Sequence, residues 1–79
     1  MPKNIKIYTT PTCAYCFALK RFLQENNIIF QEIDVASNDK AREEMLKKTN
    51  QLEVPVIEID GEIVVGFNKE KIKELLNIK

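Results

Sequence analysis

The stretch that decides the fold runs from Ile5 to Cys16 and reads IKIYTTPTCAYC. Alternating apolar and polar side chains predict a first β-strand over Lys3 to Tyr8. Pro11 cannot donate a hydrogen bond to a sheet and suits the loop that follows. A helix is then predicted from Cys13 to about Asn26, because apolar residues recur there at helical spacing. These apolar residues are Phe17, Ala18, Phe22 and Leu23.

The middle of the chain predicts a second strand and a second helix. Residues from Ile28 to Val35 are rich in β-branched side chains, and their alternation slips midway, which predicts a bulge or a strand covered on both faces. Ser37-Asn38-Asp39 offers capping side chains for a helix that ends near Lys48. The predicted apolar face of this helix comprises Ala41, Met45 and Leu46. Its predicted ion pairs are Glu43–Lys47 and Glu44–Lys48.

The C-terminal part predicts a hairpin and a last helix. Two apolar runs, Pro55 to Ile59 and Glu62 to Val65, flank Asp60-Gly61. An Asp-Gly pair in this setting is a strong hairpin signal, because both turn positions need a positive φ. Asn68 can cap the last helix. The apolar side chains expected to face inward from this helix are Ile72, Leu75, Leu76 and Ile78.

The element order is therefore βαβαββα, which predicts an α/β fold in one domain over residues 1–79. The βαβ half requires a parallel strand pair with a right-handed crossover, and the Asp-Gly turn makes the last two strands antiparallel. The compact arrangement is one mixed four-stranded sheet with helices on both faces.

Composition excludes several classes of function. Twelve basic residues balance twelve acidic ones, so no basic excess points to nucleic acid. No apolar run approaches the roughly 20 residues of a membrane span, and the N-terminus lacks the apolar stretch of a signal peptide. We therefore expect a cytoplasmic protein that binds neither nucleic acid nor membrane and is a monomer. The chain has no histidine, which removes the usual general base and the usual zinc ligand.

Cys13 and Cys16 are the candidate catalytic residues. They form a C-x-x-C motif that starts a helix directly after the first strand of a βαβ unit, the setting of an intracellular redox motif. Unpaired backbone N–H groups and the helix dipole favour an anion there, and such settings lower a cysteine pKa to about 3.5–7.5. Cys13 is expected in the first helical turn as the thiolate that attacks a substrate disulfide. Cys16, one turn further, is expected to resolve the mixed disulfide.

Lys20 has two interpretations. It lies one turn beyond Cys16 and is a candidate for tuning the pKa of the motif, because its ammonium group can help to hold negative charge. The alternative is a solvated helix lysine, since isolated surface charges contribute little.

Three further roles are open to the two cysteines. They can supply half of a metal site, but tetrahedral zinc needs four ligands and the other two would have to come from acids or a second chain. They can hold an iron–sulfur cluster shared by two subunits, which needs outside thiols. They can be buried structural thiols, although a helix start behind a Thr-Pro-Thr loop is a poor place for core. A metal or iron–sulfur carrier is therefore the alternative function.

The motifs together resemble the glutaredoxins. Ile5 to Thr9 leading to Cys13-Ala14-Tyr15-Cys16 resembles the opening of that family, where Cys-Pro-Tyr-Cys is usual. Val54-Pro55 before a strand resembles the cis-proline loop of the thioredoxin superfamily. Gly66-Phe67-Asn68 before the last helix resembles the family's glycine-containing turn. The resemblance covers nearly the whole chain and implies a fold like that of the thioredoxins and glutaredoxins in a single glutaredoxin-like domain.

This resemblance implies a substrate-binding surface. Pro55 would be cis and lie beside the cysteines, although a proline that merely starts a strand is the alternative. Val54 would offer its backbone N–H and C=O to an extended substrate segment. Tyr15 would contact substrate at the rim of the site, or be simply a half-exposed aromatic residue. The turn residues that the resemblance adds to the substrate-binding set are Gly66, Phe67 and Asn68.

Departures from the family pattern bear on the electron donor. Glutathione-using members often have a lysine at the position of Thr10 and a threonine at that of Glu53, whose charge would repel a glutathione carboxylate. The turn from Val65 to Lys69 has one glycine and no acid. Gly66-Phe67 instead resembles redoxins that serve ribonucleotide reductase and are recycled by thioredoxin reductase. We expect an electron carrier without a bound cofactor that reduces protein or small-molecule disulfides. Glutathione as co-substrate or a reductase of the flavoprotein type would recycle it.

Overall fold

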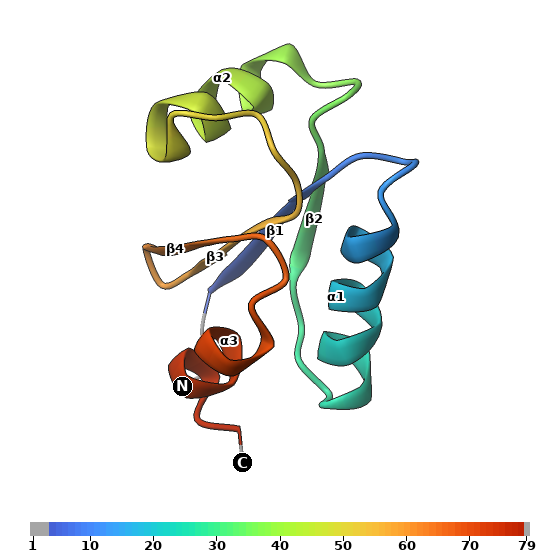
Figure 1. Cartoon of the computed structure of the whole chain (residues 1–79), viewed down its shortest axis with the longest axis vertical. Helices are drawn as coiled ribbons and strands as arrows, with labels where there is room; N and C mark the ends of the chain where they lie inside the picture. Colours follow the sequence, from blue (N-terminus) through green and yellow to red (C-terminus); the bar gives the residue numbers. More distant parts are fainter. Residues whose placement is uncertain (1–3, 79) are drawn as a thin grey trace.

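Four strands form one mixed sheet in the order β2-β1-β3-β4, in a computed structural model that describes residues 4–78 (Figure 1). The elements run in the predicted order βαβαββα. They are β1 (Ile5–Thr9), α1 (Ala14–Glu25), β2 (Gln31–Asp34), α2 (Asp39–Thr49), β3 (Val56–Ile59), β4 (Glu62–Val65) and α3 (Lys69–Leu76).

The pairing of the strands confirms the predicted topology. β1 pairs with β2 in parallel and with β3 in antiparallel orientation, so it lies inside the sheet. β3 and β4 form the antiparallel hairpin, whose turn residues Asp60 and Gly61 have φ values of +48° and +92°. Glycine adopts such a φ without steric cost, and aspartate tolerates it.

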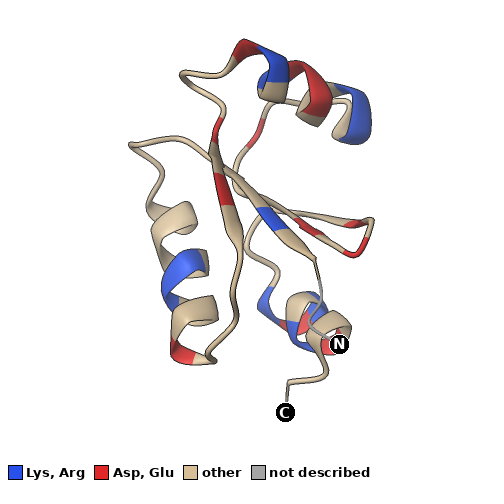
Figure 2. Cartoon of the chain, turned by 180° about the vertical axis from the view of Figure 1, so that it is seen from behind, with Lys and Arg blue, Asp and Glu red and all other residues tan. Residues whose placement is uncertain are grey.

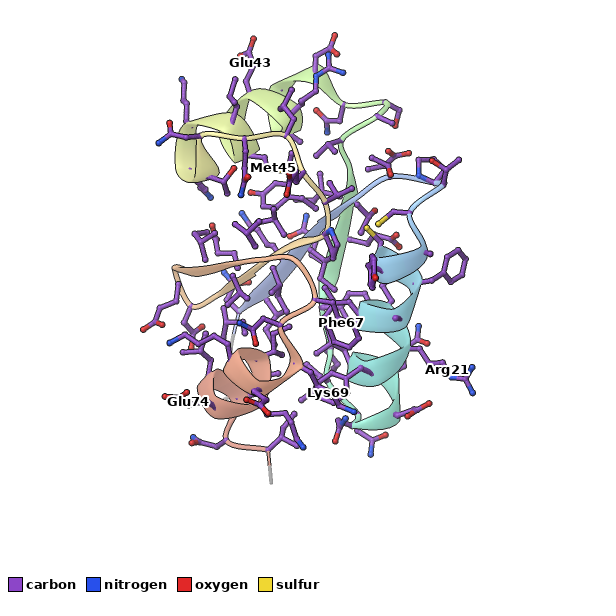
Figure 3. The ribbon with its side chains drawn as sticks, viewed as in Figure 1. Arg21, Glu43, Met45, Phe67, Lys69 and Glu74 are labelled. Atoms are coloured by element: carbon purple, nitrogen blue, oxygen red, sulfur yellow. The ribbon has the colours of Figure 1, made fainter. Side chains whose placement is uncertain are left out.

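Helices cover both faces of the sheet, as predicted. On one face α1 and α3 share a core, and on the other α2 packs on the sheet, with Phe67 in the first layer and Met45 in the second (Figure 3). Successive side chains of a strand point to opposite faces of the sheet, so neighbouring residues of β1 and β3 enter different cores. The first core comprises Ile5, Ile7, Leu19, Leu23, Ile57, Ile59, Val64 and Ile72. The second comprises Tyr8, Val35, Ala41, Met45 and Val56.

The buried face of α1 differs from the predicted one. Leu19 and Leu23 are fully buried, whereas Phe17 is 66% exposed and Ala18 is also exposed. Cys16 belongs to the buried face as well. The three buried residues follow the spacing i, i+3, i+7 of a single helical stripe, which leaves Phe17 on the opposite side.

The second strand is shorter than predicted and has no bulge. Gln31–Asp34 pairs residue by residue with β1 and forms one edge of the sheet, half exposed rather than covered on both faces. Ile28 and Phe30 precede it and pack against the first core, whereas Ile33 packs against the second. The slip in alternation therefore comes from a loop that serves one layer followed by a strand that serves the other.

The predicted ion pairs of α2 are replaced by another contact. Lys48 pairs with Glu58 of β3 at 2.5 Å instead of with Glu44, and neither predicted pair forms among the described residues. Asn38 caps the helix as predicted, accepting from the N–H of Ala41 at 3.0 Å. Leu46, expected on the apolar face, is 43% exposed.

Charges of both signs are interspersed along the helices (Figure 2). No helix within residues 4–78 combines the length and the apolar character that a membrane span requires.

Candidate functional site

Cys13 and Cys16 lie where the loop after β1 enters α1. Cys13 is the N-cap of the helix, just outside the predicted first turn, with φ −92° and ψ 111°. Its Sγ accepts a hydrogen bond from the backbone N–H of Cys16 at 3.1 Å. The sulfur thus occupies the place of the oxygen in a serine or aspartate cap. The Cys13 residue is partly exposed, and its sulfur accepts one of the N–H groups that have no partner within the helix.

Cys16 has the opposite environment. Its side chain is 1% exposed and lies on the buried stripe of α1. Burial, as the largest cause, together with the hydrogen bond to Cys13, raises the pKa of the Cys16 thiol to about 12. Both cysteines are free thiols. The pair therefore consists of an accessible sulfur at the helix end and a protonated sulfur behind it.

The loop before β3 faces the exposed sulfur. The Val54-Pro55 peptide bond is cis, which confirms the expectation from the resemblance. Cys13 donates a long thiol hydrogen bond to the carbonyl oxygen of Val54, with 3.8 Å between the two atoms. The carbonyl of Pro55 accepts from the N–H of Gly66 at 2.7 Å, which ties this loop to the turn before α3. The structure thus brings Val54 and Pro55 to Cys13.

The remaining residues expected to bind substrate divide into two groups. Tyr15 is 70% exposed at the start of α1, where its ring is accessible. Gly66 has a φ of +81° and lies in the turn tied to Pro55. Phe67 packs against Phe22, with ring centroids 6.0 Å apart, and lies on the first core. Asn68 caps α3 by accepting from Lys71 N–H at 3.2 Å. The last two residues therefore have structural contacts of their own, and their contact with substrate stays a prediction.

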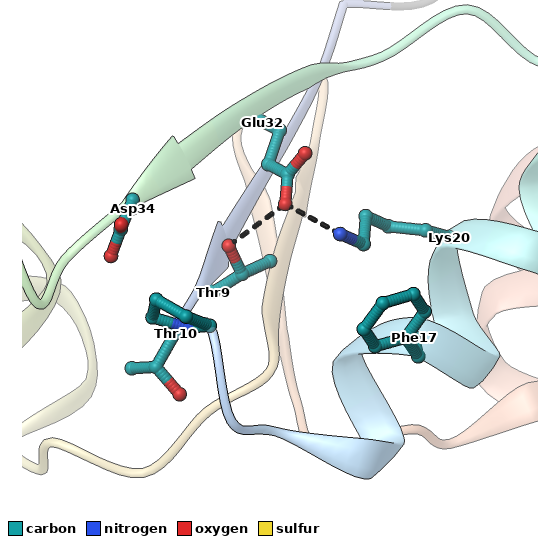
Figure 4. Close-up of a pocket in the computed structure, with 7 residues that line it drawn as sticks. Thr9, Thr10, Phe17, Lys20, Glu32 and Asp34 are labelled. Carbon is teal, nitrogen blue, oxygen red and sulfur yellow. Dashed lines mark hydrogen bonds and ion pairs between the residues drawn. The ribbon is translucent and has the colours of Figure 1, made fainter.

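Lys20 does not point freely into solvent. Its ammonium pairs with Glu32 of β2 at 2.7 Å and lies 4.8 Å from the centre of the Phe17 ring. The same Glu32 oxygen accepts from the hydroxyl of Thr9 at 3.1 Å (Figure 4). The positive charge of Lys20 lowers the pKa of Cys16, although less than burial raises it. Sequence reasoning missed Thr9 and Glu32, because their pairing depends on how α1 lies across the sheet.

A pocket of about 250 Å³ opens beside this cluster (Figure 4). It adjoins the loop that carries Cys13, whose N–H donates to the Thr10 carbonyl at 3.3 Å. Its lining residues are Thr9, Thr10, Pro11, Phe17, Lys20, Glu32 and Asp34.

A metal ion finds no ready set of ligands in the described part of the chain. Nowhere in residues 4–78 do three or more His, Cys, Asp or Glu side chains come together in a way that could hold one. The alternative of a metal or iron–sulfur carrier therefore gains no support from the arrangement of side chains.

Comparison with known proteins gives a consistent result. A family model described as glutaredoxin matches residues 5–64. An uncharacterized glutaredoxin-like 8.6 kDa protein in the rubredoxin operon of Clostridium pasteurianum is 51% identical over 72 residues, covering 91% of this chain and 96% of that protein. Glutaredoxin 3 of Escherichia coli K12 is 40% identical over 63 residues, covering 80% of this chain and 76% of that protein. Among solved structures, a mutant of the thioredoxin-like protein BC3987 superposes with a TM-score of 0.91 at 39% identity, covering 96% of this chain and 97% of that one.

Proposed function

The chain belongs to the glutaredoxin family, and from this premise we propose that it is a thiol–disulfide oxidoreductase in which Cys13 and Cys16 form the redox pair. One observation carries the proposal. The Cys13 sulfur is partly exposed and accepts the Cys16 N–H at 3.1 Å, while the Cys16 sulfur is buried directly behind it.

In the first step, the Cys13 thiolate attacks one sulfur of a substrate disulfide. A bond forms between Cys13 and that sulfur, the substrate S–S bond breaks, and the second substrate sulfur leaves as a thiolate. The backbone N–H at the start of α1 and the positive end of the helix dipole favour the anionic sulfur. This stabilisation needs no histidine, which the chain lacks.

In the second step, Cys16 loses its proton and attacks Cys13. The Cys13–Cys16 disulfide forms, and the remaining substrate sulfur leaves with the electron pair, so the substrate gains two electrons and the protein loses them. The burial of Cys16 supports its assignment as the resolving residue, because the thiolate and not the thiol is the nucleophile.

The substrate is proposed to bind along the cis-proline loop. An extended segment can add its backbone to Val54, whose carbonyl lies 3.8 Å from Cys13 Sγ in the free protein. Tyr15 is exposed enough to cover one side of such a segment. A dithiol that works as a reductant must itself be kept reduced, which we propose places the protein in the cytoplasm.

For the electron donor, we propose a flavoprotein reductase rather than glutathione. Glu53 precedes Val54 and is exposed, so its carboxylate would face the carboxylates of a bound glutathione. The turn at Gly66 contributes no acidic side chain to hold a glutathione amino group.

A coupled assay tests the function and the donor together. NADPH oxidation would be followed with a disulfide substrate and either glutathione with glutathione reductase or thioredoxin reductase alone. We expect turnover with the second system and none for Cys13→Ser. Turnover with glutathione only would overturn the donor assignment, and turnover that persists in Cys13→Ser would overturn the function. Glu53→Gln with glutathione is the matched variant, since it removes the proposed repulsion.

A further inference from the structure

The carboxylate of Glu32 on β2 connects that strand with α1 and β1. The Glu32 oxygen accepts from Lys20 of α1 at 2.7 Å and from Thr9 of β1 at 3.1 Å (Figure 4). Thr9 is 2% exposed, and its backbone continues into the loop that leads to Cys13. The carboxylate therefore fixes the helix that carries Cys16 relative to the strand that precedes the loop.

The second step of the reaction makes a demand that these contacts meet. Cys16 has to become a thiolate although it is buried. Two groups act in favour of that thiolate: the Thr10 backbone hydrogen bond and the charge of Lys20 both lower the pKa of Cys16. Lys20 is a direct partner of Glu32, and Thr10 follows Thr9, the second partner of that carboxylate.

We propose that Glu32 is a positioning residue for the resolving step, which holds the Lys20 ammonium and the Thr9–Thr10 backbone where they stabilise the thiolate of Cys16. This inference rests on the proposed function. The hydrogen bonds of Glu32 go to Lys20 and Thr9 rather than to either sulfur, so we propose that it acts through these two partners.

Glu32 is better suited to hold Lys20 than to accept the proton itself. The hydrogen bond from Lys20 is the largest cause that lowers the pKa of Glu32, which makes its carboxylate a weak base. The proton of Cys16 goes to solvent before Cys16 attacks. The charged and titratable groups facing Cys16 or Lys20 in the described residues are Cys13, Glu32 and Asp34.

The test separates the two chemical steps in one trace. Reduced protein is mixed with a small excess of dithiobis(nitrobenzoate), an aromatic disulfide whose released thiolate is coloured. The attack by Cys13 releases the first thiolate, and the attack by Cys16 on the resulting mixed disulfide releases the second. Cys16→Ser, which retains only the first release, assigns the phases.

Glu32→Gln is expected to slow the second phase about threefold and to leave the first unchanged. Losing about one pKa unit of thiolate stabilisation lowers the thiolate fraction of Cys16 about tenfold. The thiolate that remains is more basic and about threefold more nucleophilic, so the net rate falls about threefold. The second phase of Glu32→Gln should stay about threefold slower than that of the wild-type protein at each pH where both proteins stay folded. Lys20→Met should behave alike, and Lys20→Arg should restore the rate because it keeps the charge.

The controls come from the solvent side of the same helix. Arg21 pairs with Glu25 at 3.0 Å, and both side chains are well exposed, so Arg21→Met and Glu25→Gln remove equal charges without touching the cluster. A second phase in Glu32→Gln equal to that of these controls at every pH would overturn the proposal. Equal slowing of both phases would also overturn it, since Glu32 would then act on the whole loop.

The remaining outcomes are distinguishable. If circular dichroism shows that Glu32→Gln does not fold, the rates of the second phase in Lys20→Met and Lys20→Arg are compared instead. Equal rates in these two variants would reject the inference. Failure of the proposed function has a different signature: the wild-type protein and Cys13→Ser would then release thiolate alike.

Discussion

Selective alkylation is the sharpest test of the different environments of the two sulfurs. We predict that iodoacetamide at pH 7 labels Cys13 first and leaves Cys16 nearly untouched in the reduced, folded protein. Cys13 is partly exposed at the helix end, whereas Cys16 is 1% exposed with a pKa raised by burial to about 12. Only the thiolate reacts, so the ionised fraction sets the rate.

The magnitude for Cys16 follows from that pKa. At pH 7 a free thiol of pKa about 8.5 is about 3% thiolate. A thiol of pKa about 12 is about 0.001% thiolate, roughly 3,000-fold less. Because the Cys16 thiolate is more basic than that of free cysteine, it is about 40-fold more nucleophilic, which offsets part of this loss. Cys16 should thus react about 80-fold more slowly than free cysteine, and burial slows it further.

Peptide mapping measures both rates. Trypsin cleaves after Lys6 and Lys20, so both cysteines lie in one peptide, and fragmentation of the singly labelled form locates the label. Labelling in denaturant is the control, because both residues should then react equally. Labelling of Cys16 within a few-fold of free cysteine in the folded protein would refute the reasoning, whatever the rate at Cys13.

Three further predictions concern stability. The pKa of Cys16 is higher in the folded than in the unfolded chain, so its contribution to folding stability is fully present below the unfolded value near 9 and is lost as the pH rises towards 12. The melting temperature of Cys16→Ala should therefore fall less steeply with pH in that range than that of the wild-type protein. An unchanged slope would contradict this prediction. Leu19→Ala should cost about 2–5 kcal/mol in urea unfolding and Phe17→Ala well under about 1, whereas equal losses would restore the face predicted from sequence. Lys48→Met should cost about 1 kcal/mol of folding stability, because it removes the ion pair with Glu58. The hydrogen bond to Glu58 is the largest cause that raises the pKa of Lys48, so the stability difference between variant and wild type should vanish as the pH rises above the ordinary lysine value. A difference that persists at that pH would exclude the ion pair as its cause.

The sequence predicts the element order and the candidate redox pair because both depend on local signals. Asp60-Gly61 specifies a turn through backbone sterics alone, and both residues have the positive φ that the hairpin needs. Asn38 caps its helix through contacts within one turn. The spacing of Cys13 and Cys16 and their place after a strand identify them as a pair. The cis peptide at Pro55 is expected from the resemblance alone, since the local preference of a proline does not determine its isomer.

The parts that sequence missed depend on tertiary packing. The apolar residues of α1 spread over more of the helix than one stripe, and only the orientation of α1 on the sheet determines that Leu19 and Leu23 are buried while Phe17 is exposed. Glu32 gives no signal in its own strand, because its partners come from β1 and α1. The sequence pattern of one strand or helix therefore does not specify a contact that joins residues from three such elements.

The difference between the two sulfurs arises from where α1 begins. Residues three apart on a helix lie on nearly the same side, about 4.5 Å apart along the axis, so Cys13 and Cys16 are close enough to exchange a disulfide. Because the helix starts between them, the first sulfur accepts the backbone N–H of Cys16 and the second enters the buried stripe. A start one residue earlier would place Cys13 inside the helix, and its sulfur would no longer accept the Cys16 N–H. The hydrogen bond from Cys13 N–H to the Thr10 carbonyl fixes that start. This helix start supports the proposed roles, in which Cys13 attacks and Cys16 resolves.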